Sequence, residues 1–388
     1  MTATRRVNAS PKEISVEEEN VVLTDAPTKG RSAAEVNEAE GKVLKILVRT
    51  VSGGLFVLFF NFVIYAGHLY TALFIALLQW GCFREMIRVG LDPAFEKKLP
   101  GFLALQWAWF ACAAFGVYSS WLEALHADPA TDTSRLPVFV AWLLTPGYSG
   151  LACLALFSVV FVASVLVLRP PQACYLYQMR RLSFSVVALM MIFGQMRGTP
   201  AALYKGLIWY FVPSSIVATN DIMAYFTGVA VGRRFVDKPL LQLSPNKTWE
   251  GYCGAVLWTA GFAFLFTGRV AGFKWMTCPA EALTWQVHAK IDCEPHAMFR
   301  HLPAASLPSW WPADEVPVRP VQLHMMAVAV FASTVGPFGG FLASAIKRAY
   351  DIKDFAAFLP GHGGLMDRND CQMLTALFVV VYMGALGL

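Results

Sequence analysis

The sequence has few charged residues for its length. Lysine, arginine, aspartate and glutamate make up 15% of the 388 residues, whereas a soluble domain carries about a quarter. Hydrophobic residues reach 56%, and the mean hydropathy is +0.50. The net charge of +5 is small, and no single face or tail of the chain concentrates the basic residues. These values exclude an ordinary soluble domain and give no indication of nucleic-acid binding.

Familiar motifs of soluble enzymes are also absent. The chain has no GxxxxGK[ST] phosphate-binding loop, no GxGxxG dinucleotide motif, no HExxH and no GxSxG. None of the 8 cysteines forms a CxxC pair, so there is no signature of a zinc site or a redox dithiol. Cys278 and Cys293 share one long polar loop, where a disulfide and two free thiols are equally consistent with the sequence.

The N-terminal segment lacks an apolar core. Residues 1–40 are polar and acidic, so they do not read as a cleavable signal peptide. They also cannot bury enough apolar surface to offset the entropy lost on ordering. The sequence therefore predicts a disordered acidic tail over residues 1–42 and a polytopic membrane catalytic domain over residues 43–388. The first hydrophobic block would then serve as the targeting element.

What the sequence does have is a series of apolar blocks, several of them long enough to cross a bilayer, which takes about 20 residues in a helix. The ten blocks are Lys45–Ala66, Leu69–Met86, Gly101–Ser119, Pro137–Leu168, Leu182–Gly194, Thr199–Ala218, Ile222–Gly232, Tyr252–Gly268, Leu323–Ala345 and Cys371–Leu388. They predict an all-α transmembrane bundle. Pro146-Gly147 is a natural break near the start of the fourth block.

The charged loops give an orientation. Basic residues cluster after the second, fourth and seventh blocks and before the last, which places these loops in the cytosol. Three blocks separate the loops after the fourth and the seventh, although only an even number of crossings joins two cytosolic loops. We therefore expect about nine spans, with irregular backbone at the polar interruption Ala218–Asp221. The weakly charged loop at about 273–322 would be non-cytosolic.

Three polar clusters interrupt the apolar background. The first is Asn220-Asp221; a carboxylate between apolar blocks indicates a functional site, although it could instead cap a helix starting at Ile222. The second is Leu243–Gly251, where Lys247 and Thr248 precede an apolar helix. That pattern fits a helix start and an anion site about equally well.

The third cluster is the richest in charge. It contains Ser344-Ala345-Ile346-Lys347-Arg348, Lys353-Asp354, Pro360-Gly361-His362-Gly363-Gly364 and Asp367-Arg368-Asn369-Asp370. The two aspartates Asp367 and Asp370 are three residues apart and share a face if helical, which suits Mg²⁺. A solvated, salt-bridged loop would explain the charges but not the Gly-His-Gly-Gly core.

The third cluster resembles the phosphatidate cytidylyltransferase family, also called CDP-diacylglycerol synthases. The family pattern is Ser-x-apolar-Lys-Arg, Lys-Asp and Pro-x-His-Gly-Gly-apolar-x-Asp-Arg-apolar-Asp, and the chain reads SAIKR, KD and LPGHGGLMDRND. The departure is Asn369, where the family usually has an apolar residue. The segments AYFTG, SPNKTWEG and GPFGGFLAS resemble the eukaryotic branch, and Gly339-Gly340 stands where bacterial members carry Gly-Asp.

The resemblance implies that CTP and phosphatidic acid give CDP-diacylglycerol and pyrophosphate. Implied metal ligands for Mg²⁺, with room for a second metal ion, are Asp221, Asp367 and Asp370. Lys347 and His362 complete the implied catalytic set. The implied substrate-binding residues are Asn220, Lys247, Thr248, Ser344, Arg348, Lys353, Gly363, Gly364 and Arg368.

Two alternatives remain at this stage. A CTP-dependent lipid kinase, similar to dolichol kinase, would transfer the γ-phosphate to a lipid alcohol instead. A transporter would use Asp221 and the basic loops as an ion path, but the sequence shows no internal repeat. The resemblance also implies residence in the endoplasmic reticulum membrane, with the N-terminus and the site facing the cytosol. The sequence does not decide between a monomer and a homodimer.

Overall fold

The computed structural model describes residues 33–127, 147–194, 198–280, 285–288, 293–303, 315–316, 318–358 and 363–387. Contacts divide the chain into two units, Met1–Leu47 and Val48–Leu388, which are considered separately. The first contributes only the start of α1, which begins at Ala33, inside the segment assigned to the tail. All further description concerns the second unit.

Helices make up almost all of the described structure. They are α1 (Ala33–Ala66), α2 (His68–Arg88), α3 (Pro93–Lys98), α4 (Phe102–Ala127), α6 (Ser149–Leu166), α7 (Gln172–Leu189), the π-helix η2 (Met190–Gly194), α8 (Thr199–Tyr204), α9 (Ile208–Val231), α10 (Trp249–Val270), α11 (Lys274–Thr277), the 3-10 helix η3 (Ala297–Phe299), α12 (Pro320–Thr334), α13 (Pro337–Ala349) and α14 (Met366–Ala385). Strands β1 (Leu302–Pro303) and β2 (Glu315–Val316) form one short antiparallel pair. The predicted helical architecture is confirmed.

Five helical segments in the described ranges are long and apolar enough to cross a membrane. They are Phe102–Ser119, Ser149–Leu166, Gln172–Tyr204, Trp249–Val270 and Pro320–Ala349. These segments indicate a membrane protein. The count of about nine spans stays a prediction, because it also relies on helices outside this set.

The predicted break at Ala218–Asp221 is wrong. Helix α9 runs without interruption from Ile208 to Val231 and carries Asn220 and Asp221 in its second half. Polar side chains do not interrupt a helix when they face a cavity, because the backbone hydrogen bonds stay intact. The chain breaks earlier, between α8 and α9, where Gly206 has a φ of 135° that side-chain-bearing residues rarely adopt.

A second break divides the apolar block Leu323–Ala345. Helix α12 ends at Thr334, and α13 begins at Pro337. Proline has no backbone N–H, so it is well suited to the first turn of a helix. This break turns the chain towards α14, which α13 contacts. In the described part of the fourth block, α6 begins at Ser149, just after Gly147 with φ 89°. The predicted break at Pro146-Gly147 lies partly outside the described residues.

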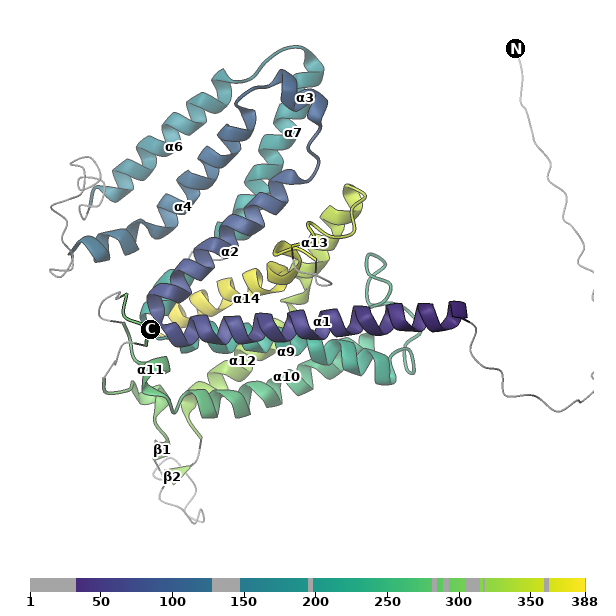
Figure 1. Ribbon diagram of the computed structural model, residues 1–388. Helices are drawn as coiled ribbons and strands as arrows, with labels where there is room; N and C mark the ends of the chain where they lie inside the picture. The colour runs from purple at the N-terminus through teal and green to yellow at the C-terminus, as the bar shows by residue number, and fades with distance from the viewer. Residues whose placement is uncertain are drawn as a thin grey trace, which may run out of the picture. The chain divides into compact units, whose positions relative to one another are not determined.

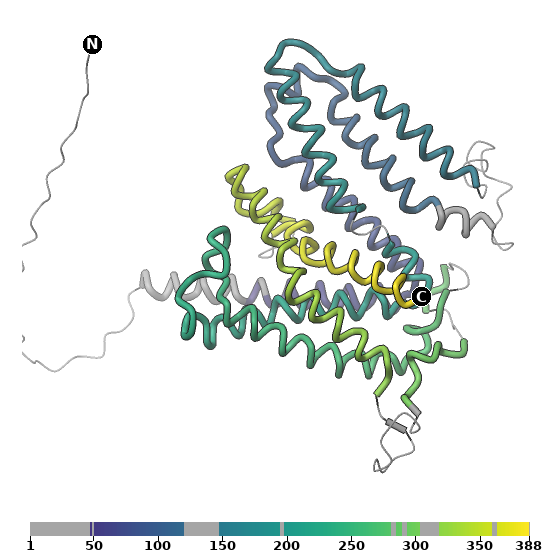
Figure 2. The backbone as a smooth tube through the Cα atoms, turned by 180° about the vertical axis from the view of Figure 1, so that it is seen from behind, coloured from purple at the N-terminus to yellow at the C-terminus, as the bar shows by residue number. Residues whose placement is uncertain are grey.

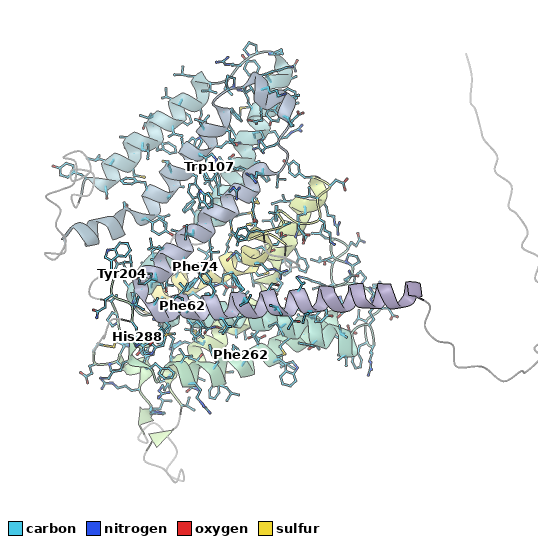
Figure 3. All side chains as sticks on the ribbon, viewed as in Figure 1. Phe62, Phe74, Trp107, Tyr204, Phe262 and His288 are labelled. Carbon is cyan, nitrogen blue, oxygen red and sulfur yellow. A yellow bond between two sulfur atoms is a disulfide. The ribbon has the colours of Figure 1, made fainter. Side chains whose placement is uncertain are left out.

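Helix α14 lies at the centre of the second unit. It contacts α2 on one side and α9, α12 and α13 on others, and both views show it between these groups (Figures 1 and 2). Helices α2, α4, α6 and α7 pack together, while α10 packs against α9 and α12. Between α2 and α4, the ring of Trp107, labelled in Figure 3, lies edge-on to that of Phe83 with the ring centres 5.3 Å apart. Helix α14 therefore joins the two groups of helices.

The polar loop after α10 is fastened to the bundle. Cys278 and Cys293 form a disulfide, which resolves the alternative that the sequence left open. The ring of His288, labelled in Figure 3, stacks on Tyr65 of α1 at 4.3 Å, and its backbone N–H donates to the carbonyl of Ala66. These contacts place the loop beside the junction of α1 and α2.

Candidate functional site

A cavity of about 550 Å³ lies among α9, α10, α12, α13 and the start of α14. It gathers residues from all three polar clusters of the sequence: Asn220-Asp221, Leu243–Gly251 and the cluster that begins much later in the chain, at Ser344. Eight of the predicted site residues line it: Asn220, Asp221, Lys247, Thr248, Ser344, Asp367, Arg368 and Asp370. The fold thus assembles one polar site from segments that the sequence could only associate by resemblance.

The other predicted residues have different positions. Lys347 does not line the cavity and pairs with Asp367 instead. Arg348 and Lys353 are exposed on α13 and on the loop after it, and Gly363 and Gly364 lie just before α14. His362 lies outside the described residues, so its predicted role is not addressed by the structure.

Two carboxylates face the cavity with oxygens available. Asp221 projects from α9 and has an exposed side chain. Asp370 is half-buried near the start of α14, ahead of the apolar run that begins at Cys371, and its Oδ1 accepts from the Cys371 N–H at 2.8 Å. Burial, reinforced by the negative charge of Asp221, raises the pKa of Asp370 to about 6. A bound cation would relieve both effects.

The carboxylate of Asp367 is already engaged. Its Oδ1 accepts from Lys347 Nζ at 2.6 Å, and its Oδ2 accepts from the backbone N–H groups of Phe355 and Gly364, each at 3.0 Å. Both side chains of the ion pair are largely buried, with 17% of Lys347 and 6% of Asp367 exposed. Through these three contacts, Asp367 links α13 and the loop that follows it to α14.

Cations complete the lining of the cavity. Lys247 lies at the mouth, with its Nζ 4.5 Å from the centre of the Phe341 ring, and Arg368 is exposed on α14. The charges of both act on Asp221. Three carboxylates line the cavity, and Asp367 is already paired with Lys347. The other two, together with two cations, are suited to a ligand that carries phosphates together with a divalent metal.

The loop before α10 is held by side chains of the motif itself. Thr248 is the N-cap of α10 and accepts from the Gly251 N–H at 3.1 Å. Glu250 accepts from the backbone N–H groups of Arg233, Phe235 and Val236 at 3.1, 2.9 and 2.9 Å. The motif therefore starts a helix, as one of its two interpretations predicted, and Lys247 lines the cavity. The anion site stays a prediction.

Close helix packing brings the walls of the cavity together. A Cβ at Gly251 would lie 2.8 Å from the Ala224 carbonyl oxygen, so α10 can approach α9 this closely only with glycine at position 251. A Cβ at Gly340 would lie 3.4 Å from Asp370 Oδ2, so α13 passes directly beside that carboxylate. At the Gly340 position a longer side chain would enter the cavity.

Gly251→Val is expected to reduce stability, because the larger side chain would push α10 away from α9. Overpacking of this kind costs about 1–3 kcal/mol. Thermal unfolding in detergent measures the loss. Gly261→Val is the matched control on the same helix, because a Cβ there meets nothing within 4 Å. Equal losses in the two variants would contradict the packing argument.

The residues fit a divalent cation only in part. No group of three or more histidine, cysteine, aspartate or glutamate side chains is arranged around a common point in the described segments. Mg²⁺, however, is usually held by one or two carboxylates together with substrate phosphates. Asp221 and Asp370 meet that requirement, whereas Asp367 would have to share Oδ1 with Lys347.

Sequence reasoning missed one acidic residue next to this site. Glu85 on α2 is 7% exposed and accepts from the backbone N–H groups of Leu365 and Met366. It is the one carboxylate of the apolar block Leu69–Met86. The rule that singled out Asp221, an ionisable side chain within an apolar block, would also have found Glu85.

Comparison with known proteins decides the family. The model of the cytidylyltransferase family matches residues 47–386. The chain belongs to this family. It is 34% identical to a probable phosphatidate cytidylyltransferase of Dictyostelium discoideum, over 94% of this chain and 73% of the relative. It is also 34% identical to phosphatidate cytidylyltransferase 1 of Arabidopsis thaliana, over 94% and 84%. The human phosphatidate cytidylyltransferase 1 is 36% identical over 84% and 68%.

The matched region includes every element that lines the cavity. Family membership therefore identifies the chain as an enzyme, a nucleotidyltransferase related to eukaryotic phosphatidate cytidylyltransferases. The resemblance inferred from the third polar cluster is confirmed.

Proposed function

We propose that the chain transfers the cytidylyl group of CTP to phosphatidic acid, giving CDP-diacylglycerol and pyrophosphate. The observation that carries the proposal is the cavity itself. In a member of the cytidylyltransferase family, it combines Asp221 and Asp370 with Lys247 and Arg368. This set suits two polyanionic substrates whose phosphates must be brought together against their mutual repulsion.

The reaction does not require a covalent intermediate with the protein. A phosphate oxygen of phosphatidic acid attacks the α-phosphorus of CTP, a new P–O–P bond forms, and the bond to the β-phosphate breaks with release of pyrophosphate. That oxygen is already ionised near neutral pH, so the main requirements are positioning and charge neutralisation. Lys247 and Arg368 both line the cavity and would supply positive charge there, and the planar guanidinium can bind two phosphate oxygens.

Asp221 and Asp370 would hold Mg²⁺, which neutralises phosphate charge when bound. Asn220 and Ser344 would contribute polar groups to the same wall; the Ser344 hydroxyl already donates to the Gly340 carbonyl, and its oxygen can still accept. Asp367 stays a proposed metal ligand. Its hydrogen bonds show that it also holds the loop that precedes α14.

The orientation follows from the two ends of α10. Its N-terminus adjoins Lys247 at the cavity mouth, and its C-terminus leads into the loop closed by the disulfide Cys278–Cys293. The 22 residues of α10 span about 33 Å, enough to cross the hydrocarbon core. Disulfides persist in oxidising compartments, so this loop is expected in the lumen and the cavity mouth in the cytosol. We propose that the protein resides in the membrane of the endoplasmic reticulum.

The test is a product assay on the purified full chain in detergent, with CTP, phosphatidic acid and Mg²⁺. The proposal expects a CDP-lipid and pyrophosphate in equal amounts. Formation of CDP and a phosphorylated lipid alcohol would establish the lipid kinase instead, and CTP turnover without any lipid product would contradict both. Lys353→Cys, labelled in intact microsomes by a membrane-impermeant maleimide, tests the cytosolic position; protection from the reagent would contradict it.

A further inference from the structure

The N-cap residue of α14 does not cap its own helix. The N-cap residue Leu365 is apolar, and no side-chain hydrogen bond from the N-cap is present. The first N–H groups of a helix have no partner within the helix, so buried ones must be bound by other groups. Here the acceptors come from a helix almost three hundred residues earlier in the chain.

Glu85, in the last turn of α2, provides these acceptors. Its Oε1 accepts from the Leu365 N–H and its Oε2 from the Met366 N–H, each at 2.8 Å. The preceding N–H, that of Gly364, is bound by Asp367 Oδ2 at 3.0 Å. Two carboxylates thus bind three consecutive backbone N–H groups at the start of α14, which we call the carboxylate clamp.

The fit around the clamp is close. Glu85 is buried, and a Cβ at Gly364 would collide with its Oε2, so the glycine allows the carboxylate to reach the backbone. A Cβ at Gly81, one turn earlier on α2, would collide with the Leu365 side chain. The end of α2 and the start of α14 are therefore held at one separation, and a small displacement of Glu85 would move the first turn of α14.

The charged residues that α14 contributes to the cavity lie close to that turn. Asp367 and Arg368 follow directly on the clamped residues, and Asp370 lies in the next turn. We propose that Glu85 is a positioning residue for the nucleotidyl-transfer site: through the start of α14 it fixes Asp370 and Arg368 relative to Asp221. The inference rests on the proposed function, since it assigns Glu85 to that same site.

The alternative is a purely structural role, in which Glu85 stabilises the fold and has no effect on the site. A buried carboxylate that caps a helix stabilises the protein wherever the helix lies. A lower thermal midpoint in a Glu85 variant would therefore fit both roles. Some residues do not touch the metal but hold its ligands in place. Substituting such a residue typically lowers metal affinity or activity about 10- to 100-fold. The dependence of the reaction on Mg²⁺ is therefore the informative measurement, together with the mobility of the clamped N–H groups.

The experiment compares Glu85→Gln and Glu85→Asp with Gln79→Leu in the full chain. Gln79 is buried on the same helix, where its Oε1 accepts from the Tyr118 hydroxyl at 2.6 Å. Among the described residues, its side chain makes no hydrogen bond to α14. Glu85→Gln keeps the shape but turns an N–H₂ group towards one backbone N–H. Glu85→Asp keeps the charge on a shorter side chain, so it is expected to lie between wild type and Glu85→Gln.

Two readouts are taken for each variant. Hydrogen–deuterium exchange of the segment 363–370, without substrate or metal, reports the clamp itself. The Mg²⁺ concentration for half-maximal CDP-lipid formation reports the geometry of the site. Glu85→Gln is expected to speed the exchange and to raise the half-maximal Mg²⁺ concentration roughly tenfold or more. Gln79→Leu is expected to lower the thermal midpoint with neither change.

Unchanged exchange in Glu85→Gln, or an unchanged Mg²⁺ dependence despite faster exchange, would overturn the proposal. An equal shift of the Mg²⁺ dependence in Gln79→Leu would do the same, because it would reflect general loosening of the fold. If wild-type protein forms no CDP-lipid, the proposed function fails, whereas the exchange measurement still decides whether Glu85 holds the start of α14.

Discussion

Asp370→Asn is expected to reduce CDP-lipid formation roughly a thousandfold while the protein stays folded. Asparagine keeps the size and an oxygen that can accept from the Cys371 N–H, so the local backbone bond can persist. It removes the negative charge that Asp370 presents to the cavity beside Asp221. If the loss of one charged metal ligand costs about 4 kcal/mol of the barrier, the rate falls by about three factors of ten.

The matched control for Asp370→Asn is the preceding residue. Asn369→Leu replaces a side chain that donates to the Leu365 carbonyl within α14 and does not line the cavity. It also restores the apolar character that the family pattern has at this position, so near-native turnover is expected. Steady-state assays across a range of Mg²⁺ concentrations measure both variants. Native turnover in Asp370→Asn would remove this residue from the site.

The polar clusters of the sequence located most of the cavity, because ionisable groups are rare in apolar segments and usually have a function there. Asp221 was found in this way, whereas Asp370 was found by its spacing from Asp367 and by the family resemblance. The structure brings both to one cavity. Glu85 satisfied the same criterion but was counted as part of an apolar block. Its partners, the N–H groups of Leu365 and Met366, are backbone groups, which a sequence motif cannot indicate.

The breaks between helices were harder to predict. Asn220 and Asp221 suggested an interruption, yet α9 continues through them because their side chains have a cavity to face. The real breaks follow backbone chemistry: Gly206 adopts a positive φ, and Pro337 opens α13. Polarity of a side chain indicates what it contacts, whereas glycine and proline restrict where a helix can begin or end.

The contacts of a single carboxylate also lay beyond the sequence. The spacing of Asp367 and Asp370 on one helix face predicted two equivalent metal ligands. The two differ because Lys347 and the Phe355 N–H, 20 and 12 residues earlier in the chain, reach Asp367 and leave Asp370 to the cavity. A pattern of residue types gives the faces of a helix but not which partners arrive from other segments.

Asp367→Asn is expected to lose both activity and stability, in contrast to Asp370→Asn. The neutral side chain leaves the ammonium of Lys347 without its anion in a largely buried position. Removing one partner of a buried ion pair costs about 3–5 kcal/mol, so the thermal midpoint in detergent should fall by several degrees. Activity should fall at least a hundredfold. The weakened hydrogen bond to the Gly364 N–H would no longer hold the preceding loop against the start of α14.

A double variant separates the ion pair from the site. Lys347→Met combined with Asp367→Asn removes both charges, and replacing a buried pair with neutral groups is often close to neutral for stability. The double variant should therefore be more stable than Asp367→Asn alone, yet remain inactive if the Asp367 carboxylate is needed for catalysis. Asp351→Asn is the control: Asp351 is exposed with φ 53°, and asparagine tolerates that backbone conformation well, so both properties should stay near wild type. Recovery of full turnover in the double variant would show that Asp367 serves only to neutralise Lys347 and is not a metal ligand.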